Sequence, residues 1–460
     1  MDLADAPDTI AAIATPAGRG GVGIIRLSGP NAFHISRSIC GREPRPREAT
    51  LVSFRDKEGE GLDQGLVLHF PGPHSFTGED VAELHCHGGP AVLSATLHAC
   101  LQHGARGAHA GEFSQRAFLN GKIDLVQAEA IADLIAASSR AAARSASRSL
   151  SGEFSKRVNR ILDGLTQLRV FVEAAIDFPE EEIDFIGESD VSGRIAQLHR
   201  ELNELLINAR RGRRLRDGLK IVLAGAPNAG KSSLLNQLAE AESAIVTDVP
   251  GTTRDVLREH IDIDGMPLHV VDTAGLRDTE DAIEREGVRR AEAEIRSADR
   301  ILLVSDASIG DRHASDEEIC AEHAGRLGEA VPIIIVRNKI DAVGESPGIA
   351  NSEASRVESR INLSAKTGAG IDLLRRQLLE SAGLGEGTDS DFIARERHIV
   401  SLENTLAHLE ASQSVLIDRR APELVAEDLR YAQEALGQVT GKLSSDDLLG
   451  EIFSSFCIGK

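Results

Sequence analysis

The clearest chemistry in the sequence lies at residues 225–232, which read Gly-Ala-Pro-Asn-Ala-Gly-Lys-Ser. This order fits G-x-x-x-x-G-K-[ST], the phosphate-binding loop. Glycine at both ends lets the backbone turn its N–H groups toward a phosphate. We expect Lys231 to reach the outer phosphates and the Ser232 hydroxyl to bind Mg²⁺. The residues expected around the phosphates are Asn228, Ala229, Gly230, Lys231, Ser232 and Ser233. An ordinary glycine turn before a helix is the alternative.

Two further motifs favour guanine as the base. Asn338-Lys339-Ile340-Asp341 follows an apolar run at residues 331–336. Guanine presents N1–H and N2–H₂ on one edge, and the two oxygens of Asp341 accept both. Asn338 is expected to brace this loop, and the stem of Lys339 to cover the ring. Ser364-Ala365-Lys366 follows another strand and offers backbone N–H groups to guanine O6. The pattern therefore predicts GTP rather than ATP as the nucleotide.

Residues between these motifs fit the sensors of a third phosphate. Asp272-Thr273-Ala274-Gly275 follows a predicted strand at 268–272, so Asp272 is placed to orient the Mg²⁺ shell and the Gly275 N–H to sense the phosphate. Residues 247–255, between the phosphate-binding loop and Asp272, have the position of a switch loop, and Thr253 is its expected Mg²⁺ ligand. Its expected contacts are Thr247, Asp248, Val249, Pro250, Gly251, Thr252 and Thr253. Leu276 stands where many regulatory GTPases place a water-orienting Gln, so hydrolysis needs another group or is slow.

Strands and helices must position these residues, and the length of 460 residues predicts two to four domains. Aromatic residues are only 3% and Trp is absent, so the cores are aliphatic. The net charge of −21 argues against broad, non-specific nucleic-acid binding. It does not exclude a local basic patch, or nucleic acid that a partner protein presents. No apolar run reaches membrane-spanning length, the N-terminus lacks a signal-peptide core, and five scattered cysteines fit reduced thiols. We expect a cytosolic protein.

The first 120 residues predict an α+β domain, with strands at 10–14, 22–27, 66–70 and 81–86 and a helix at 91–102. His85 and His87 share one face of a strand, which would suit a metal ion. Because no further ligand stands at metal spacing, a polar strand end is the preferred interpretation.

Helical spacing dominates both flanks of the nucleotide-binding module. Before the module, helical spacing runs from residue 122 through Arg148, resumes at 154–172, is broken at Pro179 and returns at 191–211. Beyond the module it covers 394–416, 423–436 and the terminal segment. Residues 211–218 are interpreted as a basic, solvated linker or a contact for an anionic partner, and 383–391 as a second linker. Each flank alone exposes an apolar stripe, so we expect one discontinuous helical domain with the α/β module inserted. The expected domains are 1–120, 121–217, 218–382 and 383–460.

The loop and the Gly-Thr-Thr-Arg-Asp, Asp-Thr-Ala-Gly-Leu-Arg, Asn-Lys-Ile-Asp and Ser-Ala-Lys motifs resemble those of the MnmE/TrmE family of tRNA-modification GTPases. Residues 14–29, 76–90, 111–135 and the terminal Phe-Cys-Ile-Gly-Lys match this family as well. The resemblance covers essentially the whole chain. It implies an N-terminal α+β folate-binding-like domain, a discontinuous helical domain and an inserted Ras-like P-loop GTPase domain.

The resemblance also implies the chemistry and the partners. Arg26, Glu83, Lys122 and Lys460 align with contacts to a tetrahydrofolate derivative, of the 5-formyl or methylene type; surface ion pairing is the alternative for the first three. The family forms a homodimer, and its FAD-dependent partner joins it in a heterotetramer. Together they place a carboxymethylaminomethyl or aminomethyl group on carbon 5 of the wobble uridine of certain tRNAs.

In this family the GTPase domains dimerise across the nucleotide, and K⁺ takes the role of an arginine finger. Asn228, Thr247, Val249 (main chain) and Thr252 align with the K⁺ ligands, and Glu284 with the acid that orients water. Cys457 aligns with a C-terminal cysteine that is either a nucleophile or a buried thiol.

Two other functions fit parts of the sequence. One is a ribosome- or assembly-associated GTPase switch, which would not need a folate site. The other is a folate-dependent methyltransferase with a regulatory GTPase insert. The phosphate-binding loop is the only nucleotide fingerprint recognised, so redox chemistry would have to come from a partner.

Overall fold

The computed structural model describes residues 8–177, 191–240, 258–272, 298–309, 315–323, 331–352, 354, 356–382, 392–418, 421–442 and 446–459. The chain divides into two compact units. The first contains Met1–Ala132, Ser149–Leu202 and Ser401–Lys460, and the second Asp133–Arg148 and Asn203–Val400. Within the described ranges, no helix combines the length and apolar character needed to cross a membrane.

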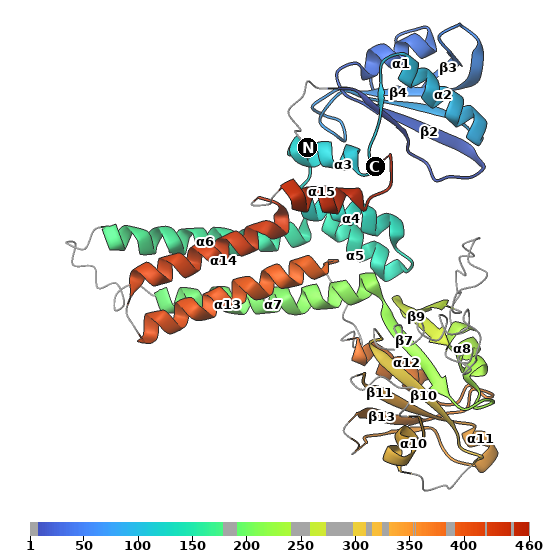
Figure 1. Cartoon of the computed structure of the whole chain (residues 1–460), viewed down its shortest axis with the longest axis vertical. Coiled ribbons are helices and arrows are strands. Elements are labelled where there is room, and N and C mark those ends of the chain that lie inside the picture. Colours follow the sequence, from blue (N-terminus) through green and yellow to red (C-terminus); the bar gives the residue numbers. More distant parts are fainter. Residues whose placement is uncertain are drawn as a thin grey trace, which may run out of the picture. The chain divides into compact units, whose positions relative to one another are not determined.

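The first unit begins with a six-stranded sheet in the order β3-β4-β5-β2-β1-β6 (Figure 1). Its strands are antiparallel except for the parallel pair β1 and β6. Alternation explains the buried face, since Ala82, Leu84 and Cys86 of β5 enter the core with residues of helices α1 and α2. The bounds are β1 Ile10–Ile13, β2 Gly20–Ser28, α1 Ala32–Cys40, β3 Thr50–Arg55, β4 Gly61–Phe70, β5 Val81–Gly88, α2 Pro90–Gln102 and β6 Arg106–Gly107.

Helices from both ends of the chain complete this unit. Helix α6 lies alongside α14 (Figure 1), where Gln433 Nε2 donates to Thr166 Oγ1 at 2.9 Å. Helix α15 places Phe453 and Phe456 against Leu125 of α4. The helical segments before and after the inserted module therefore pair, as the sequence predicts. The bounds are α3 Glu112–Leu119, α4 Leu125–Ala136, α6 Glu153–Asp177, α13 Glu396–Asp418, α14 Pro422–Thr440 and α15 Asp446–Ser454.

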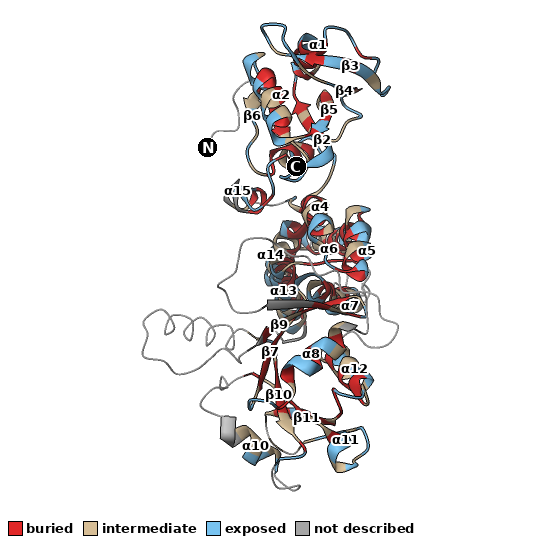
Figure 2. Cartoon of the chain, turned by 90° about the vertical axis from the view of Figure 1, so that its right-hand side faces the viewer, coloured by how far each residue is buried: buried red, intermediate tan, exposed pale blue. Residues whose placement is uncertain are grey.

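The second unit contains a seven-stranded sheet in the order β12-β13-β11-β10-β7-β9-β8. The five inner strands are parallel, and β8 and β12 are antiparallel edges. Buried residues line both faces of β7 and β10 (Figure 2), which explains their continuous apolar runs. The bounds are β7 Leu219–Gly225, α8 Lys231–Glu240, β8 Arg258–Ile263, β9 Met266–Asp272, β10 Arg300–Asp306, α10 Asp316–His323, β11 Ile333–Asn338, α11 Ile340–Val343, β12 Gly348–Ala350, β13 Val357–Asn362 and α12 Ile371–Ser381.

The basic run at residues 211–218 is helical, so its interpretation as a linker was wrong. Helix α7 spans Val191–Asp217 and ends at Gly218, whose φ of 72° suits a left-handed cap. Leu215 is buried, and Arg216 Nε donates to Asp133 Oδ1 at 2.8 Å. Paired charges and an apolar contact therefore continue the helix to Asp217, and Gly218 alone separates it from β7.

The predicted continuous helix through Arg148 is interrupted between α4 and α5, which spans Arg140–Leu150. The Ser139 hydroxyl accepts a hydrogen bond from the Ala142 N–H at 3.0 Å, an N-terminal cap that starts a new helix. The same hydroxyl donates to the Gly265 carbonyl in the turn between β8 and β9. A Cβ at Gly265 would lie 2.6 Å from that of Ala141, so the turn and α5 are in close contact.

Candidate functional site

The phosphate-binding loop lies between β7 and α8, as its sequence predicts. Gly225 and Gly230 have φ values of 137° and 97°, where side chains are strained. A Cβ at Gly225 would lie 2.1 Å from the Val304 carbonyl oxygen, and one at Gly230 would lie 2.2 Å from Asn338 Nδ2. The loop therefore keeps its shape only with glycine at these two positions, and this shape is the cradle that a phosphate requires.

Lys231 begins α8 and turns its side chain back over the loop. Its Nζ donates to the carbonyl oxygens of Gly225 at 2.9 Å and Ala226 at 3.0 Å. The side chain is largely buried, whereas Ser232 and Ser233 are exposed in the first turn. The ammonium group therefore lies against the first two residues of the loop, and the exposed Ser232 could reach a metal ion bound there.

Asn338 joins the phosphate loop to both guanine motifs. Its side chain is 2% exposed, and its Nδ2 donates to the Ala229 carbonyl oxygen at 2.9 Å. Its Oδ1 accepts from the backbone N–H of Lys339 at 2.7 Å and of Ala365 at 2.9 Å. One buried amide therefore fixes three segments that are far apart in the sequence.

The guanine motifs present their polar groups at the same edge of the sheet. Asp341 is exposed, and its Oδ1 accepts from the hydroxyl of buried Ser364 at 2.6 Å. Lys339 has a φ of 65°, and its Nζ pairs with Asp306 Oδ2 at 2.5 Å. Lys366 is exposed. This arrangement orients Asp341 and brings Asn338, Lys339, Ser364 and Ala365 together.

Part of the predicted site can be located only in outline. Asp272 ends β9 opposite Leu223 of β7, so its backbone lies beside the phosphate loop. The predicted ligands Thr247, Asp248, Val249, Pro250, Gly251, Thr252, Thr253, Thr273, Ala274 and Gly275 lie outside the described residues, as do Leu276, Glu284 and Lys460.

A second group of predicted residues meets in the N-terminal sheet. Arg26 and Glu83 are cross-strand partners on β2 and β5, with Nη2 and Oε1 2.9 Å apart. The Arg26 guanidinium carbon lies 5.6 Å from the ring centroid of Phe76. Lys122 Nζ donates to the Pro73 carbonyl oxygen at 2.8 Å. Arg26 and Lys122 therefore contact one loop, residues 71–80 between β4 and β5.

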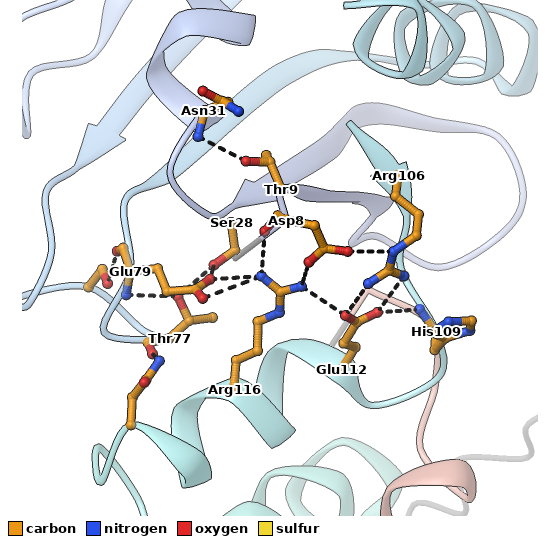
Figure 3. A network of polar contacts seen from close by, with 12 residues as sticks. Asp8, Thr9, Ser28, Asn31, Thr77, Glu79, Arg106, His109, Glu112 and Arg116 are labelled. Carbon is orange, nitrogen blue, oxygen red and sulfur yellow. Dashed lines mark hydrogen bonds and ion pairs between the residues drawn. The ribbon is translucent and has the colours of Figure 1, made fainter. Parts of the chain in front are cut away.

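An ionic network behind this loop was not predicted from the sequence (Figure 3). Arg116 Nη1 pairs with Glu79 Oε2 at 3.1 Å, and its Nη2 lies 3.0 Å from Glu112 Oε1. Arg106 Nη2 also pairs with that oxygen at 2.7 Å, and Asp8 contacts both arginines. Burial raises the pKa of Glu112, but hydrogen bonds from Arg106, the His109 N–H and Arg116 outweigh burial and lower it. The network holds the loop to α3.

The histidine pair of β5 and the C-terminal cysteine bear on two alternatives that the sequence left open. His85 Nε2 lies 3.2 Å from Glu83 Oε2, and His87 Nδ1 lies 2.8 Å from Asp63 Oδ1. Each histidine therefore pairs with a carboxylate, and within the described ranges no group of three metal-ligating side chains occurs. Cys457 is exposed, so its interpretation as a buried thiol was wrong. The neighbouring Ile458 forms a bridge with Ala110.

A doubly wound parallel sheet, a glycine cradle after its strand β7 and an Asn-Lys-x-Asp motif braced against that cradle define a P-loop GTPase. Two family models match the chain on either side of residue 123: the "GTP-binding protein TrmE N-terminus" at residues 9–122 and the "MnmE helical domain" at residues 125–457. The chain belongs to the MnmE family of tRNA modification GTPases.

Curated relatives match almost end to end. The chain is 54% identical over 454 residues to a protein of Yersinia pseudotuberculosis serotype IB (strain PB1/+), covering 98% of this chain and 99% of the relative. It is 54% identical over 455 residues to one of Marinobacter nauticus, covering 99% of each. Both are named tRNA modification GTPase MnmE.

Two solved structures align with part of the chain. The G domain of the T. maritima FeoB iron transporter aligns at 22% identity with a TM-score of 0.26, covering 36% of this chain and 98% of that one. Aquifex aeolicus Era aligns at 23% identity with a TM-score of 0.27, covering 44% and 69%. Scores this low add nothing to the assignment.

Proposed function

We propose that this protein is a K⁺-stimulated GTPase that modifies the wobble uridine of certain tRNAs together with an FAD-dependent partner. Family membership supplies the coarser function, a GTPase of tRNA modification. The finer proposal adds a homodimer, a partner subunit that brings flavin, and a one-carbon unit from a tetrahydrofolate derivative.

The contact between Asn338 and the phosphate loop is the observation that carries the nucleotide assignment. Its amide donates to Ala229 and accepts from Lys339 and Ala365, so phosphate and base motifs are held at one site. Asp341 completes that site as the acceptor for guanine N1–H and N2–H₂. An adenine ring would offer a different pattern at that edge, which supports GTP as the substrate.

Hydrolysis would use groups of this chain around the cradle. Lys231 would contact the outer phosphates, while Ser232, Thr253 and Asp272 would hold Mg²⁺ or its water shell. Asn228 is exposed on the loop and has a φ of 64°. A K⁺ ion bound there would offset the charge that develops between two phosphates.

Thr247, Thr252 and the main chain of Val249 would complete the K⁺ shell, and Glu284 would orient the attacking water. Two GTPase domains would dimerise across the nucleotide to complete this arrangement.

One-carbon chemistry is proposed for the N-terminal sheet. Arg26 and Lys122 contact the loop at residues 71–80, and Glu83 pairs with Arg26. The C-terminal segment reaches the same domain through the bridge between Ala110 and Ile458. Lys460 and Cys457 belong to that segment. A folate with a carboxylate tail and a polar ring would meet cationic and anionic groups here.

Mass analysis of total tRNA tests the proposal. Deletion of the gene is expected to remove the modification at carbon 5 of the wobble uridine, and the parent gene is expected to restore it. A Lys231→Ala variant, expressed at the same level, should fail to restore it because the phosphate contact is lost. Unchanged wobble uridine after deletion would exclude tRNA modification and favour a GTPase switch in ribosome assembly.

A further inference from the structure

Asp306 lies between the two strands that carry the nucleotide motifs, although no motif assigns it a role. It ends β10, which is parallel to β7 on one side and to β11 on the other. Val304 stands opposite Gly225 of the phosphate loop, and Asp306 stands opposite Asn338. Its carboxylate therefore reaches the edge of the sheet where phosphate and base motifs meet.

The Asp306 carboxylate is fixed by three hydrogen bonds. Its Oδ1 accepts from the Ser308 N–H at 2.9 Å and from the Ser308 hydroxyl at 2.6 Å. Its Oδ2 accepts from Lys339 Nζ at 2.5 Å, and the side chain is 7% exposed. Burial raises the pKa of Asp306, but the bonds from Lys339 and Ser308 outweigh burial and lower it. Asp306 is therefore a preorganised anion at neutral pH.

Lys339 is consequently held at both of its ends. Its backbone N–H donates to Asn338 Oδ1 at 2.7 Å, and its ammonium group is bound by Asp306. Only the aliphatic stem lies between these anchors, and a lysine stem packs readily on an apolar or aromatic face. Holding the side chain in one conformation in advance removes the entropy that ordering it would otherwise cost upon binding.

We propose that Asp306 is a positioning residue for the guanine nucleotide, because it holds the stem of Lys339 over the face of the base. The proposal rests on the guanine site assigned above and adds a residue that acts through Lys339. It also differs from a model in which Lys339 must leave Asp306 to contact the nucleotide. In that model, removal of the carboxylate would strengthen binding, whereas here it weakens binding.

Release of guanosine diphosphate carrying a fluorescent ribose label from the full chain tests this role. Asp306→Ala should accelerate release by about tenfold, the effect of losing one charge-assisted hydrogen bond that orders a side chain. Lys339→Ala should accelerate release at least as much. If Asp306 acts through Lys339, Asp306→Ala should have less than about a twofold effect in the Lys339→Ala background.

Two controls separate positioning from general stability. Glu345→Ala breaks another ion pair of the same sheet edge, from Arg337 Nη1 of β11 to Glu345 Oε2 at 2.7 Å, and should leave release unchanged. Ser308→Ala removes one bond to Asp306 but keeps its pair with Lys339, and should change release by less than about twofold.

Each outcome decides the matter. The proposal would be overturned if Asp306→Ala accelerated release about tenfold in the Lys339→Ala background as well. Slower release from the single Asp306→Ala variant would also overturn it. Either result would leave the guanine site intact. If the parent protein did not bind the labelled nucleotide at all, the guanine site and the proposed function would fail together.

Discussion

Asp133 accepts a hydrogen bond from Arg395, which follows it by 262 residues, with Nη2 and Oδ1 2.8 Å apart. Asp133 lies in α4, and Arg395 immediately precedes α13. The same oxygen accepts from Arg216 at the end of α7, just before the inserted sheet begins. One carboxylate therefore joins the segment that enters the GTPase module to the segment that leaves it.

Asp133→Ala is expected to destabilise this junction by about 2–3 kcal/mol. The Asp133 side chain is 6% exposed but Arg216 is 33% exposed, so the cost should be smaller than for a fully buried pair. Thermal unfolding monitored by circular dichroism would show a lower Tm. Glu153→Ala, which removes an exposed pair with Lys156, is the control and should change stability by less than about 0.5 kcal/mol. Equal effects of the two variants would contradict the role of Asp133.

Glu112 should make the N-terminal domain sensitive to acid. Its pKa in the folded state lies below the ordinary value of 4.5, so its ionised form stabilises the fold above that value. This contribution is lost as the pH falls through the folded pKa. Glu112→Gln cannot ionise, so its Tm should be lower than that of the parent at neutral pH, and the difference should shrink as the pH falls below 4.5. Glu48→Gln changes an exposed carboxylate and should show the same Tm as the parent at each pH. A Tm difference for Glu112→Gln that does not change with pH would refute the link between Glu112 ionisation and stability.

We expect the base specificity to depend on Asp341. Asp341→Asn replaces an acceptor by a donor facing guanine N1–H, so affinity for GTP should fall by at least about tenfold. Xanthine presents a carbonyl oxygen where guanine has its amino group, so xanthosine triphosphate should bind the variant better than the parent. Equilibrium titration with both nucleotides measures the exchange of preference. GTP binding by Asp341→Asn at the parent's affinity would remove Asp341 from the site.

Local patterns allowed the phosphate loop, the guanine motifs and most strands to be predicted, because each depends on neighbouring residues. The strands β3, β6, β8, β10 and β12 and the helix α1 were not predicted. The continuation of α7 depends on Asp133, and the network around Arg116 joins Asp8, Glu79 and Glu112. The charged partners in these contacts lie up to 108 residues apart in the sequence and leave no local pattern. Neither the continuation of α7 nor the network around Arg116 could therefore be predicted from residue spacing. The pairing of Asp306 with Lys339 was missed for the same reason.

Folate binding should depend on Arg26 and Lys122 together. Both contact the loop at residues 71–80 (Arg26 through the ring of Phe76, Lys122 through a carbonyl), and both are cations that could meet a carboxylate tail. The double variant Arg26→Ala/Lys122→Ala should bind 5-formyltetrahydrofolate at least about tenfold more weakly in a calorimetric titration. Arg37→Ala, which breaks an exposed pair with Glu43 on α1, should bind normally. Unchanged affinity in the double variant would place the folate elsewhere.

GTP turnover should be much faster in potassium than in sodium chloride. Leu276 offers no group that orients water, and a cation between the phosphates would lower the barrier as charge develops there. Asn228→Ala should abolish the difference between the salts. It should leave nucleotide binding nearly intact, because Lys231 and the glycine cradle remain.

Glu284→Ala should lower kcat with little change in KM, as expected for a contact made mainly in the transition state. Steady-state assays in matched salts measure all three proteins. Equal rates of the parent in the two salts would rule out the potassium mechanism, and full kcat in Glu284→Ala would exclude that residue from it.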